Sequence, residues 1–346
     1  MKKSLTLFFA ISILFACGQE KKSAITSDKE KLFIIQNPDI NSKNFVLKLL
    51  EKVKHYHKEP IYYMRIGKAN CVIEVLVNDY PIHNDYELSN YATPIEINHC
   101  ILKSGKQKLT YRLYPTGDLM KESYGGDEET VTTLTDFTSV SIKIIQMDNK
   151  GEQKLKDEVV VMQHNSLSDK SGKFVASGKP YYEYTFEFQA EVPYNLEGWT
   201  KGQDLTKLDE KMLEKKALDF HNMYQKIYEN QDADALAKIE FNAIKRQALV
   251  YYYNKEDITE MWNEVLKILL VKNKTFESID QYKIVFFGDK KILMLMQKNL
   301  NIEFRGFGMF NMKYINESGV NSSMLSGIDL SLPEGKRLEN GLYVAG

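Results

Sequence analysis

The sequence lacks an excess of either charge and is poor in proline. Its 46 basic and 47 acidic residues give a formal net charge of −1, and the two signs are interleaved along the chain. Because nucleic-acid binding needs a basic field that neutralises phosphates, this balance argues against a nucleic acid as the partner. Proline contributes only 8 residues while apolar residues make up 43%, so we expect a folded core rather than a disordered chain.

Short motifs that carry well-known catalytic chemistry are also absent. The sequence has no Gly-x-Ser-x-Gly element, no Ser-x-x-Lys set with its usual companions and no recognisable Cys–His pair. Gly306-Phe307-Gly308 lacks the third glycine and the following helix of a dinucleotide-binding loop. Glycines inside a predicted strand indicate a bulge or a tight bend instead. These absences argue against an enzyme and against a bound cofactor.

Long hydrophobic segments are missing too, apart from one apolar run from Leu5 to Ala16 that follows Lys2 and Lys3. This run is shorter than the ~20 residues that a helix needs to cross a bilayer. A basic start followed by a short apolar run is typical of an export signal. We therefore expect residues 1–16 to be a cleaved signal peptide.

The apolar run ends in Leu14-Phe15-Ala16-Cys17. With Leu14 three residues and Ala16 one residue before the cysteine, this segment resembles the lipobox of bacterial lipoproteins. The resemblance implies cleavage before Cys17 and acylation of its sulfur and its new amino group. Acyl chains on Cys17 would hold the protein at a membrane by lipid alone. The alternative is an ordinary secretory signal with an incidental cysteine.

Residues 17–30 are polar and predict a flexible stalk between the anchor and the folded part. Position 18 is glycine, not the aspartate that keeps enterobacterial lipoproteins at the inner membrane. By that analogy we expect the chain in the bacterial cell envelope, at the outer rather than the inner membrane. Its expected partners are the membrane, through the lipid anchor, and an envelope protein or glycan.

Cysteine is rare, with 3 residues in the sequence. If Cys17 carries the lipid, Cys71 and Cys100 form an even pair in a compartment that permits disulfides. Alternatively, both are small buried apolar residues, since Cys71 shares a face of a predicted strand with Ile73 and Val75. Both alternatives stay open, because geometry decides whether two cysteines can be joined.

Short alternating strands dominate the chain from residue 60 to about 192, after a lead-in that begins at residue 31. Turn residues such as Asn78-Asp79 separate them, and the polar segment 115–135 predicts a long loop. The pattern is typical of an antiparallel β-sandwich, which we expect over residues 31–192. The predicted strands cover residues 71–77, 94–98, 109–114, 137–147, 159–162 and 181–188.

The pattern changes after a predicted linker at residues 193–204. Apolar residues then recur at helical spacing and predict three helices, the second of which begins at Asp232. Alternating strands return near residue 282 and continue past Gly319. We expect an α+β domain over residues 205–346, in which three helices precede an antiparallel meander.

The run Phe220…Tyr224…Tyr228, followed by Asp232 and Leu236, resembles the opening helix pair of the NTF2-like (SnoaL-like) cone. The resemblance is confined to residues 220–250. It implies two helices that cover a curved sheet, and it carries no catalytic residue.

Two clusters of polar residues could bind a metal. His55, His57 and Glu59 would project from one face of a strand and could ligate Zn²⁺. Lys54 and Lys58 flank them and oppose a cation, so a solvated polar segment is the preferred interpretation. The carboxylates of Asp118, Glu122, Asp127, Glu128 and Glu129 could bind Ca²⁺, but their spacing does not match the EF-hand pattern, and a solvated loop is preferred.

Apolar and aromatic residues offer two further candidates. One is a set that could line a pocket or pack as core, of which core packing is preferred: Phe304, Phe307, Met309, Phe310 and Met312. The other is the abundance of tyrosine, with 21 residues. Exposed tyrosines suit contact with sugars or proteins.

Three hypotheses for function remain open. The preferred one is a non-enzymatic binding module at the envelope. The second is an envelope hydrolase whose active site has no recognisable motif. The third is an immunity-type or inhibitor protein that neutralises a toxin.

Overall fold

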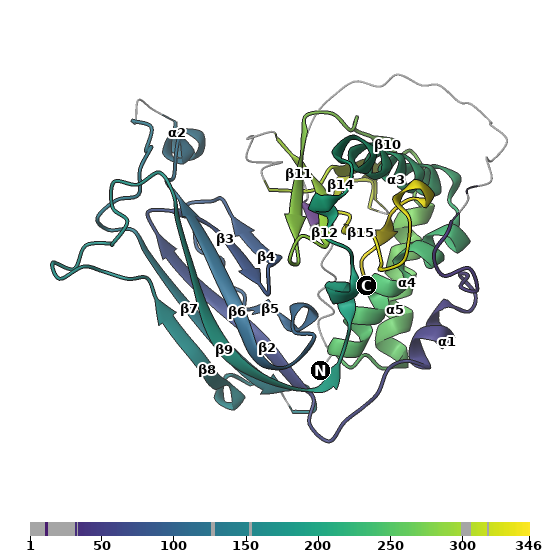
Figure 1. The fold of residues 1–346 in the computed structure, drawn as a ribbon, viewed down its shortest axis with the longest axis horizontal. Helices are drawn as coiled ribbons and strands as arrows, with labels where there is room; N and C mark the ends of the chain where they lie inside the picture. Colours follow the sequence, from purple (N-terminus) through teal and green to yellow (C-terminus); the bar gives the residue numbers. More distant parts are fainter. Residues whose placement is uncertain are drawn as a thin grey trace. The chain divides into compact units, whose positions relative to one another are not determined.

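The computed structural model describes residues 11–12, 32, 34–125, 129–151, 154–298, 306–316 and 318–346. The chain forms two compact units (Figure 1). The sandwich unit comprises Lys54–Glu197 and Val250–Tyr252. The α+β unit comprises Met1–Val53, Gly198–Leu249 and Tyr253–Gly346. The predicted signal peptide (apart from residues 11–12), Cys17 and the stalk at 17–30 lie outside the described residues.

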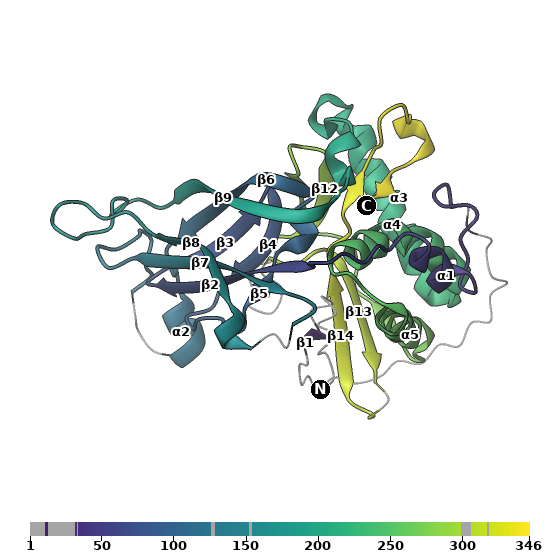
Figure 2. The ribbon, with the colours of Figure 1, turned by 90° about the horizontal axis from the view of Figure 1, so that it is seen from below.

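The sandwich unit contains two antiparallel four-stranded sheets, ordered β5-β2-β7-β8 and β4-β3-β6-β9, which confirms the predicted sandwich (Figure 2). Asn78 and Asp79 both adopt positive φ between β3 and β4, as a tight hairpin turn requires. The strands of this unit are β2 Pro60–Ala69, β3 Val72–Val77, β4 Tyr80–Asp85, β5 Ile95–Glu96, β6 Lys103–Tyr114, β7 Ser139–Asp148, β8 Val159–Asn165 and β9 Tyr182–Asn195.

Alternation along the strands places apolar side chains between the two sheets. Leu109, Tyr111 and Leu113 of β6 are fully buried, whereas the residues between them are only half-buried. Two contacts join the sheets across this core. The Tyr62 hydroxyl on β2 accepts a hydrogen bond from the Glu191 amide on β9 at 2.7 Å, and the Tyr111 hydroxyl lies 3.1 Å from Nε2 of His164 on β8.

A three-residue segment distant in sequence completes the sandwich unit. The buried Asn98 amide donates to the carbonyl oxygens of Pro60 at 2.9 Å and Val250 at 3.0 Å. Tyr252 packs its ring against Tyr194, with centroids 6.0 Å apart. These contacts explain why Val250–Tyr252 belongs to this unit, although the sequence placed it in the other domain.

Helices α3 Glu210–Asn230, α4 Ala233–Val250 and α5 Lys255–Leu270 confirm the three predicted helices of the α+β unit. Each begins at a side-chain cap that satisfies otherwise unpaired backbone amides. The carboxylates of Asp209 and Asp232 accept from Met212 N at 2.8 Å and Ala235 N at 2.9 Å. Asn254 forms a capping box at the start of α5.

Helix α1 Phe45–Leu50 belongs to the α+β unit, which corrects the prediction that the sandwich domain with its lead-in begins at residue 31; the sandwich unit begins at Lys54. Phe45 is fully buried and stacks on Trp262 of α5, with ring centroids 4.0 Å apart. Its ring also meets the edge of Phe241 on α4 at 5.8 Å. Burial of such a side chain contributes about 1.5–3 kcal/mol, which is enough to fix the segment on the helices.

Two further antiparallel sheets are ordered β11-β12-β15-β16 and β1-β14-β13-β10. All of their strands except β1, which lies in the predicted signal peptide, follow the helices and bear out the expected meander. Figure 2 shows β13 and β14 side by side, with β1 beside β14. The bounds are β1 Ile11–Ser12, β10 Thr275–Phe276, β11 Tyr282–Phe287, β12 Ile292–Gln297, β13 Phe310–Ile315, β14 Asn321–Ser326, β15 Leu330–Ser331 and β16 Tyr343–Val344.

Two glycines allow the chain to pass from one of these sheets to the other. Gly308 pairs with Met296 of β12 just before β13 begins, so the glycine marks a bend between sheets, as the sequence indicated. A Cβ atom on Gly308 would lie 2.2 Å from the Cα of Gly327. No larger residue fits that crossing without displacement of backbone.

Candidate functional site

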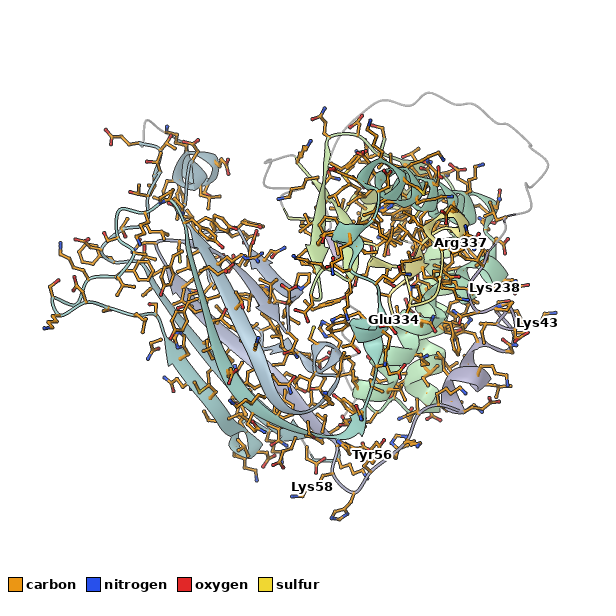
Figure 3. All side chains as sticks on the ribbon, viewed as in Figure 1. Lys43, Tyr56, Lys58, Lys238, Glu334 and Arg337 are labelled. Atoms are coloured by element: carbon orange, nitrogen blue, oxygen red, sulfur yellow. The ribbon has the colours of Figure 1, made fainter. Side chains whose placement is uncertain are left out.

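The metal candidate His55, His57 and Glu59 is not assembled. The three residues precede β2 and are not in a strand, so they do not share a strand face (Figure 3 labels Tyr56 and Lys58 on this segment). Glu59 is buried; its Oε1 lies 3.0 Å from His55 Nδ1 and accepts from Tyr56 N at 3.1 Å. His57 is exposed. Over the described residues no group of three or more His, Cys, Asp or Glu could hold a metal ion.

Glu59 instead anchors the start of β2. Its backbone amide donates to Asp148 Oδ1 at 3.2 Å, and its carbonyl accepts from Asn149 N at 2.8 Å. These bonds join the beginning of β2 to the end of β7, where Pro60 pairs with Asp148. Glu59 therefore has a structural role in the sandwich.

Cys71 and Cys100 are buried thiols and do not form the disulfide that the sequence left open. Cys71 precedes β3, whereas the Cys100 carbonyl accepts from the side chain of Asn78, which follows β3. The six residues of β3 separate the two positions. At about 3.3 Å per residue, that length far exceeds the Cα separation of a disulfide.

Among the carboxylates considered for Ca²⁺, Asp118 has a structural role. Asp118 accepts a hydrogen bond from Thr130 and pairs with Lys121 at 3.4 Å, while Asp127 and Glu128 lie outside the described residues. Helix α2 Leu119–Tyr124 occupies part of the predicted loop.

The apolar set packs as core rather than lining a pocket. Met309, Phe310 and Met312 are buried, and the Phe310 ring lies 4.9 Å from Tyr224 and 5.4 Å from Tyr228. Phe304 lies outside the described residues.

A different group of residues forms a polar aromatic surface on the outer face of the β4-β3-β6-β9 sheet. Glu74 of β3 is in register with Arg112 of β6, which is in register with Glu183 of β9. Since neighbouring β6 residues Tyr111 and Leu113 point into the core, the alternation directs these three side chains outward. We call this surface the tyrosine–arginine platform; it consists of Glu74, Tyr86, Arg112, Tyr114, Tyr181 and Glu183.

Hydrogen bonds fix the side chains of the platform. Arg112 Nε donates to Glu183 Oε2 at 2.7 Å, and its Nη1 lies 3.9 Å from Glu74 Oε2. Tyr114 donates to Glu74 Oε2 at 3.1 Å, and Tyr181 donates to Glu183 Oε2 at 2.8 Å. The Tyr86 hydroxyl also donates to Glu74. Each carboxylate therefore receives donors from more than one residue, and the rings are held in place.

The platform is open to solvent at one side. Tyr181 is 41% exposed, and the side chains of Glu183 and Arg112 are 42% and 30% exposed. The Tyr114 and Tyr181 rings lie 5.3 Å apart at an interplanar angle of 49°. Two rings and three charged groups thus border one accessible face.

Hydrogen bonds, neighbouring charges and burial shift the pKa values of the platform residues. The hydrogen bond from Arg112 lowers the pKa of Glu183, and burial raises the pKa of Tyr181, with help from Glu183, to about 12. Burial lowers the pKa of Arg112, but the bond to Glu183 and its charge outweigh it and raise the pKa overall. At neutral pH Glu183 is therefore ionised, Arg112 is charged, and Tyr114 and Tyr181 are protonated.

An aromatic cluster on the opposite side of the same strands supports the platform from the sandwich interior. His164 of β8 stacks on Phe186 and Tyr184 of β9, with ring centroids 4.5 and 5.0 Å apart. Its Nε2 meets the Tyr111 hydroxyl of β6. These contacts fix β6 and β9, the two strands that carry Arg112 and Glu183.

Comparison with known protein families, with curated proteins and with solved structures finds no match for this chain. Among the helices in the described part of the chain, none combines the length and the apolar character needed to span a membrane.

The abundance of tyrosine in the sequence suggested a contact surface for sugars or proteins, but the charged residues of the platform were not identified from the sequence. Glu183 alternates with Tyr182 and Tyr184, and Arg112 alternates with Tyr111 and Leu113. This alternation is the signal from which the outward direction of both charges could have been found. Their pairing depends on strand register, which the sequence alone did not supply.

Proposed function

We propose that this chain is a lipid-anchored, non-enzymatic protein of the bacterial cell envelope whose sandwich unit binds a glycan through the tyrosine–arginine platform. One observation supports this most: the accessible Tyr114 and Tyr181 rings lie beside the fixed charges of Arg112 and Glu183. The lipobox-like segment that ends at Cys17 supports the anchor and the location.

The chemistry of the platform suits a sugar. One face of a pyranose ring carries C–H groups that pack on an aromatic ring, while its hydroxyls need polar partners. Glu183 and Glu74 can accept from such hydroxyls, and Arg112 can donate to them. Because hydrogen bonds already orient these groups, little conformational entropy is lost when the ligand binds.

The same charges argue against the alternative of an envelope hydrolase. Two carboxylates can cleave a glycosidic bond only if one is protonated and acts as general acid, which requires a raised pKa. The pKa of Glu183 is lowered instead, chiefly by its hydrogen bond from Arg112. Glu183 is therefore unsuited to the role of general acid in such a cleavage.

Binding of purified full-length protein to polysaccharides and peptidoglycan from bacterial envelopes tests the proposal. Tyr181→Ala should reduce retention on the bound glycan about tenfold or more, since aromatic anchors contribute most to such contacts. Tyr124→Ala is the matched control, because Tyr124 is an exposed tyrosine on α2 outside the platform. Equal loss in both variants, or no glycan bound by the parent protein, would contradict the proposal.

The anchor has its own test. Intact-mass analysis of protein expressed with its own signal should show loss of residues 1–16 and a gain of acyl chains, and Cys17→Ala should abolish both. A cleaved product without acyl chains would exclude the lipid anchor and leave the glycan-binding proposal standing.

A further inference from the structure

The α+β unit contains a cavity that the proposed glycan surface does not use. Its volume is about 170 Å³. That is close to the ~150 Å³ of an engineered apolar cavity that accommodates benzene, and well below the ~300 Å³ at which sites for drug-sized ligands begin. The cavity can therefore accept one aromatic ring or one branched aliphatic group, but not a sugar chain.

One stripe of α3 forms a wall of the cavity. Lys216, Asp219, Phe220 and Met223 line it and recur at the three- and four-residue spacing of a single helix face. Phe220 is buried and Met223 is half-buried. The stripe thus combines an apolar part with a cation and an anion that lie one helical turn apart.

Two segments that lie far apart in the sequence form further walls of the cavity. Ile35 and Gln36 line the cavity from the segment before α1, and Leu342 lines it from the segment before β16. Gln36 fixes these walls, because its Nε2 donates to Ile239 O at 2.6 Å and its Oε1 accepts from Val344 N at 3.0 Å. The cavity is consequently held open by a buried amide rather than by surface side chains.

Both charged residues of the stripe keep bonding capacity for a ligand. Lys216 Nζ donates to the Glu339 carbonyl at 2.7 Å, but an ammonium has three donors. Asp219 Oδ2 accepts from Lys215 at 2.7 Å, and a carboxylate accepts several hydrogen bonds. A ligand with one negative and one positive group can therefore pair with Lys216 and Asp219 together.

We infer that this cavity binds a free amino acid with an aromatic or branched aliphatic side chain. The side chain occupies the apolar space between Phe220, Met223 and Leu342. The carboxylate of the ligand pairs with Lys216, and its ammonium pairs with Asp219. The charges of the site and its volume together select this class, since a purely apolar molecule leaves both charges unused and a larger one does not fit.

Isothermal titration calorimetry on the full-length protein tests the assignment with a set of small probes. L-phenylalanine and L-leucine should bind, whereas glycine, which has no side chain to fill the cavity, should give no detectable heat. N-acetyl-L-phenylalanine lacks the ammonium and phenethylamine lacks the carboxylate. Each should bind about tenfold more weakly, which corresponds to loss of one charge-assisted contact of about 1.4 kcal/mol.

Variants of α3 locate the site. Lys216→Met should weaken L-phenylalanine binding about tenfold, while Lys211→Met, at an exposed position of the same helix outside the cavity lining, should leave the affinity within about twofold. Met223→Trp fills the cavity and should abolish binding, and Ile35→Phe fills it from a second segment if Met223→Trp does not fold. Thermal unfolding of each variant identifies those that fold.

Three results would overturn the inference: no binding of either amino acid at millimolar concentration, unchanged binding in a folded cavity-filling variant, or equal affinity for phenethylamine and L-phenylalanine. Loss of glycan binding in Tyr181→Ala has no bearing on these results, because the platform residues do not line the cavity.

Discussion

Arg112 Nε donates to Glu183 Oε2 across β6 and β9 at 2.7 Å, and this bond lowers the pKa of the carboxyl group. Replacement of Arg112 by Met removes the largest influence that lowers the pKa of Glu183. We expect that pKa to rise toward the ordinary value of a glutamate, and NMR titration of the Glu183 carboxyl carbon measures it. The free energy of unfolding should change by no more than about 1 kcal/mol, because the pair is partly exposed to solvent.

Lys106→Met is the matched control for this change. Lys106 pairs with Glu187 at 3.0 Å across the same two strands, with its side chain 75% exposed. Its removal should leave the titration of Glu183 unchanged. An equal shift in both variants would mean that the general field of the sheet, rather than the Arg112 bond, controls Glu183.

Lys274 joins the carboxyl ends of two helices. Its Nζ donates to the carbonyl oxygens of Tyr228, in the last turn of α3, at 2.7 Å and of Leu269, in the last turn of α5, at 2.6 Å. Lys274→Met keeps the aliphatic stem but leaves both carbonyls without this donor. We expect a loss of about 1–3 kcal/mol in the free energy of unfolding, measured by urea denaturation. Lys272→Met, at an exposed position nearby, should cost less than about 0.5 kcal/mol.

The elements that sequence predicted well are those set by local rules. Alternation identified the sandwich strands, and the cap at Asp232 followed from a short polar side chain before an apolar helical run. Asn78 and Asp79 predicted their turn because such residues tolerate positive φ. Each of these features depends on neighbours within a few residues.

The features that sequence could not supply depend on pairing between distant segments. The platform forms because strand register aligns Glu74, Arg112 and Glu183, which lie far apart along the chain. The cavity requires residues 34–36 and 340–342 to meet on α3. The segment with Phe45 was assigned to the wrong domain because its apolar pattern does not reveal which core it joins.

His221 makes stability depend on pH. It is fully buried in α3, its Nδ1 donates to Ala217 O at 2.9 Å, and its buried Nε2 has no hydrogen-bond partner among the described residues. Burial lowers its pKa below that of the unfolded chain. As pH falls below about 6.5, the unfolded chain therefore takes up a proton more readily, and the free energy of unfolding decreases. Above that range both states are neutral and the contribution is constant.

His221→Leu should accordingly flatten the pH dependence. Urea denaturation at neutral pH and near pH 5 should show a smaller decrease in stability for this variant than for the parent chain. His57→Leu serves as the control, since His57 is exposed before β2. The same slope in His221→Leu and the parent chain would show that other groups account for acid sensitivity.

A single methyl group at Gly308 should be costly. The Cβ of an alanine there would lie 2.2 Å from Gly327 Cα and 2.4 Å from Ser326 O, both backbone atoms that cannot move independently of β14. We expect Gly308→Ala to lower the free energy of unfolding by about 1–3 kcal/mol or more, because overpacking displaces backbone. Gly67→Ala is the control, since a Cβ at Gly67 meets nothing within 4 Å and its φ is not positive. Comparable stability of the two variants would contradict the close backbone approach of Gly308 to Gly327. It would also show that the bend between the two sheets does not require glycine.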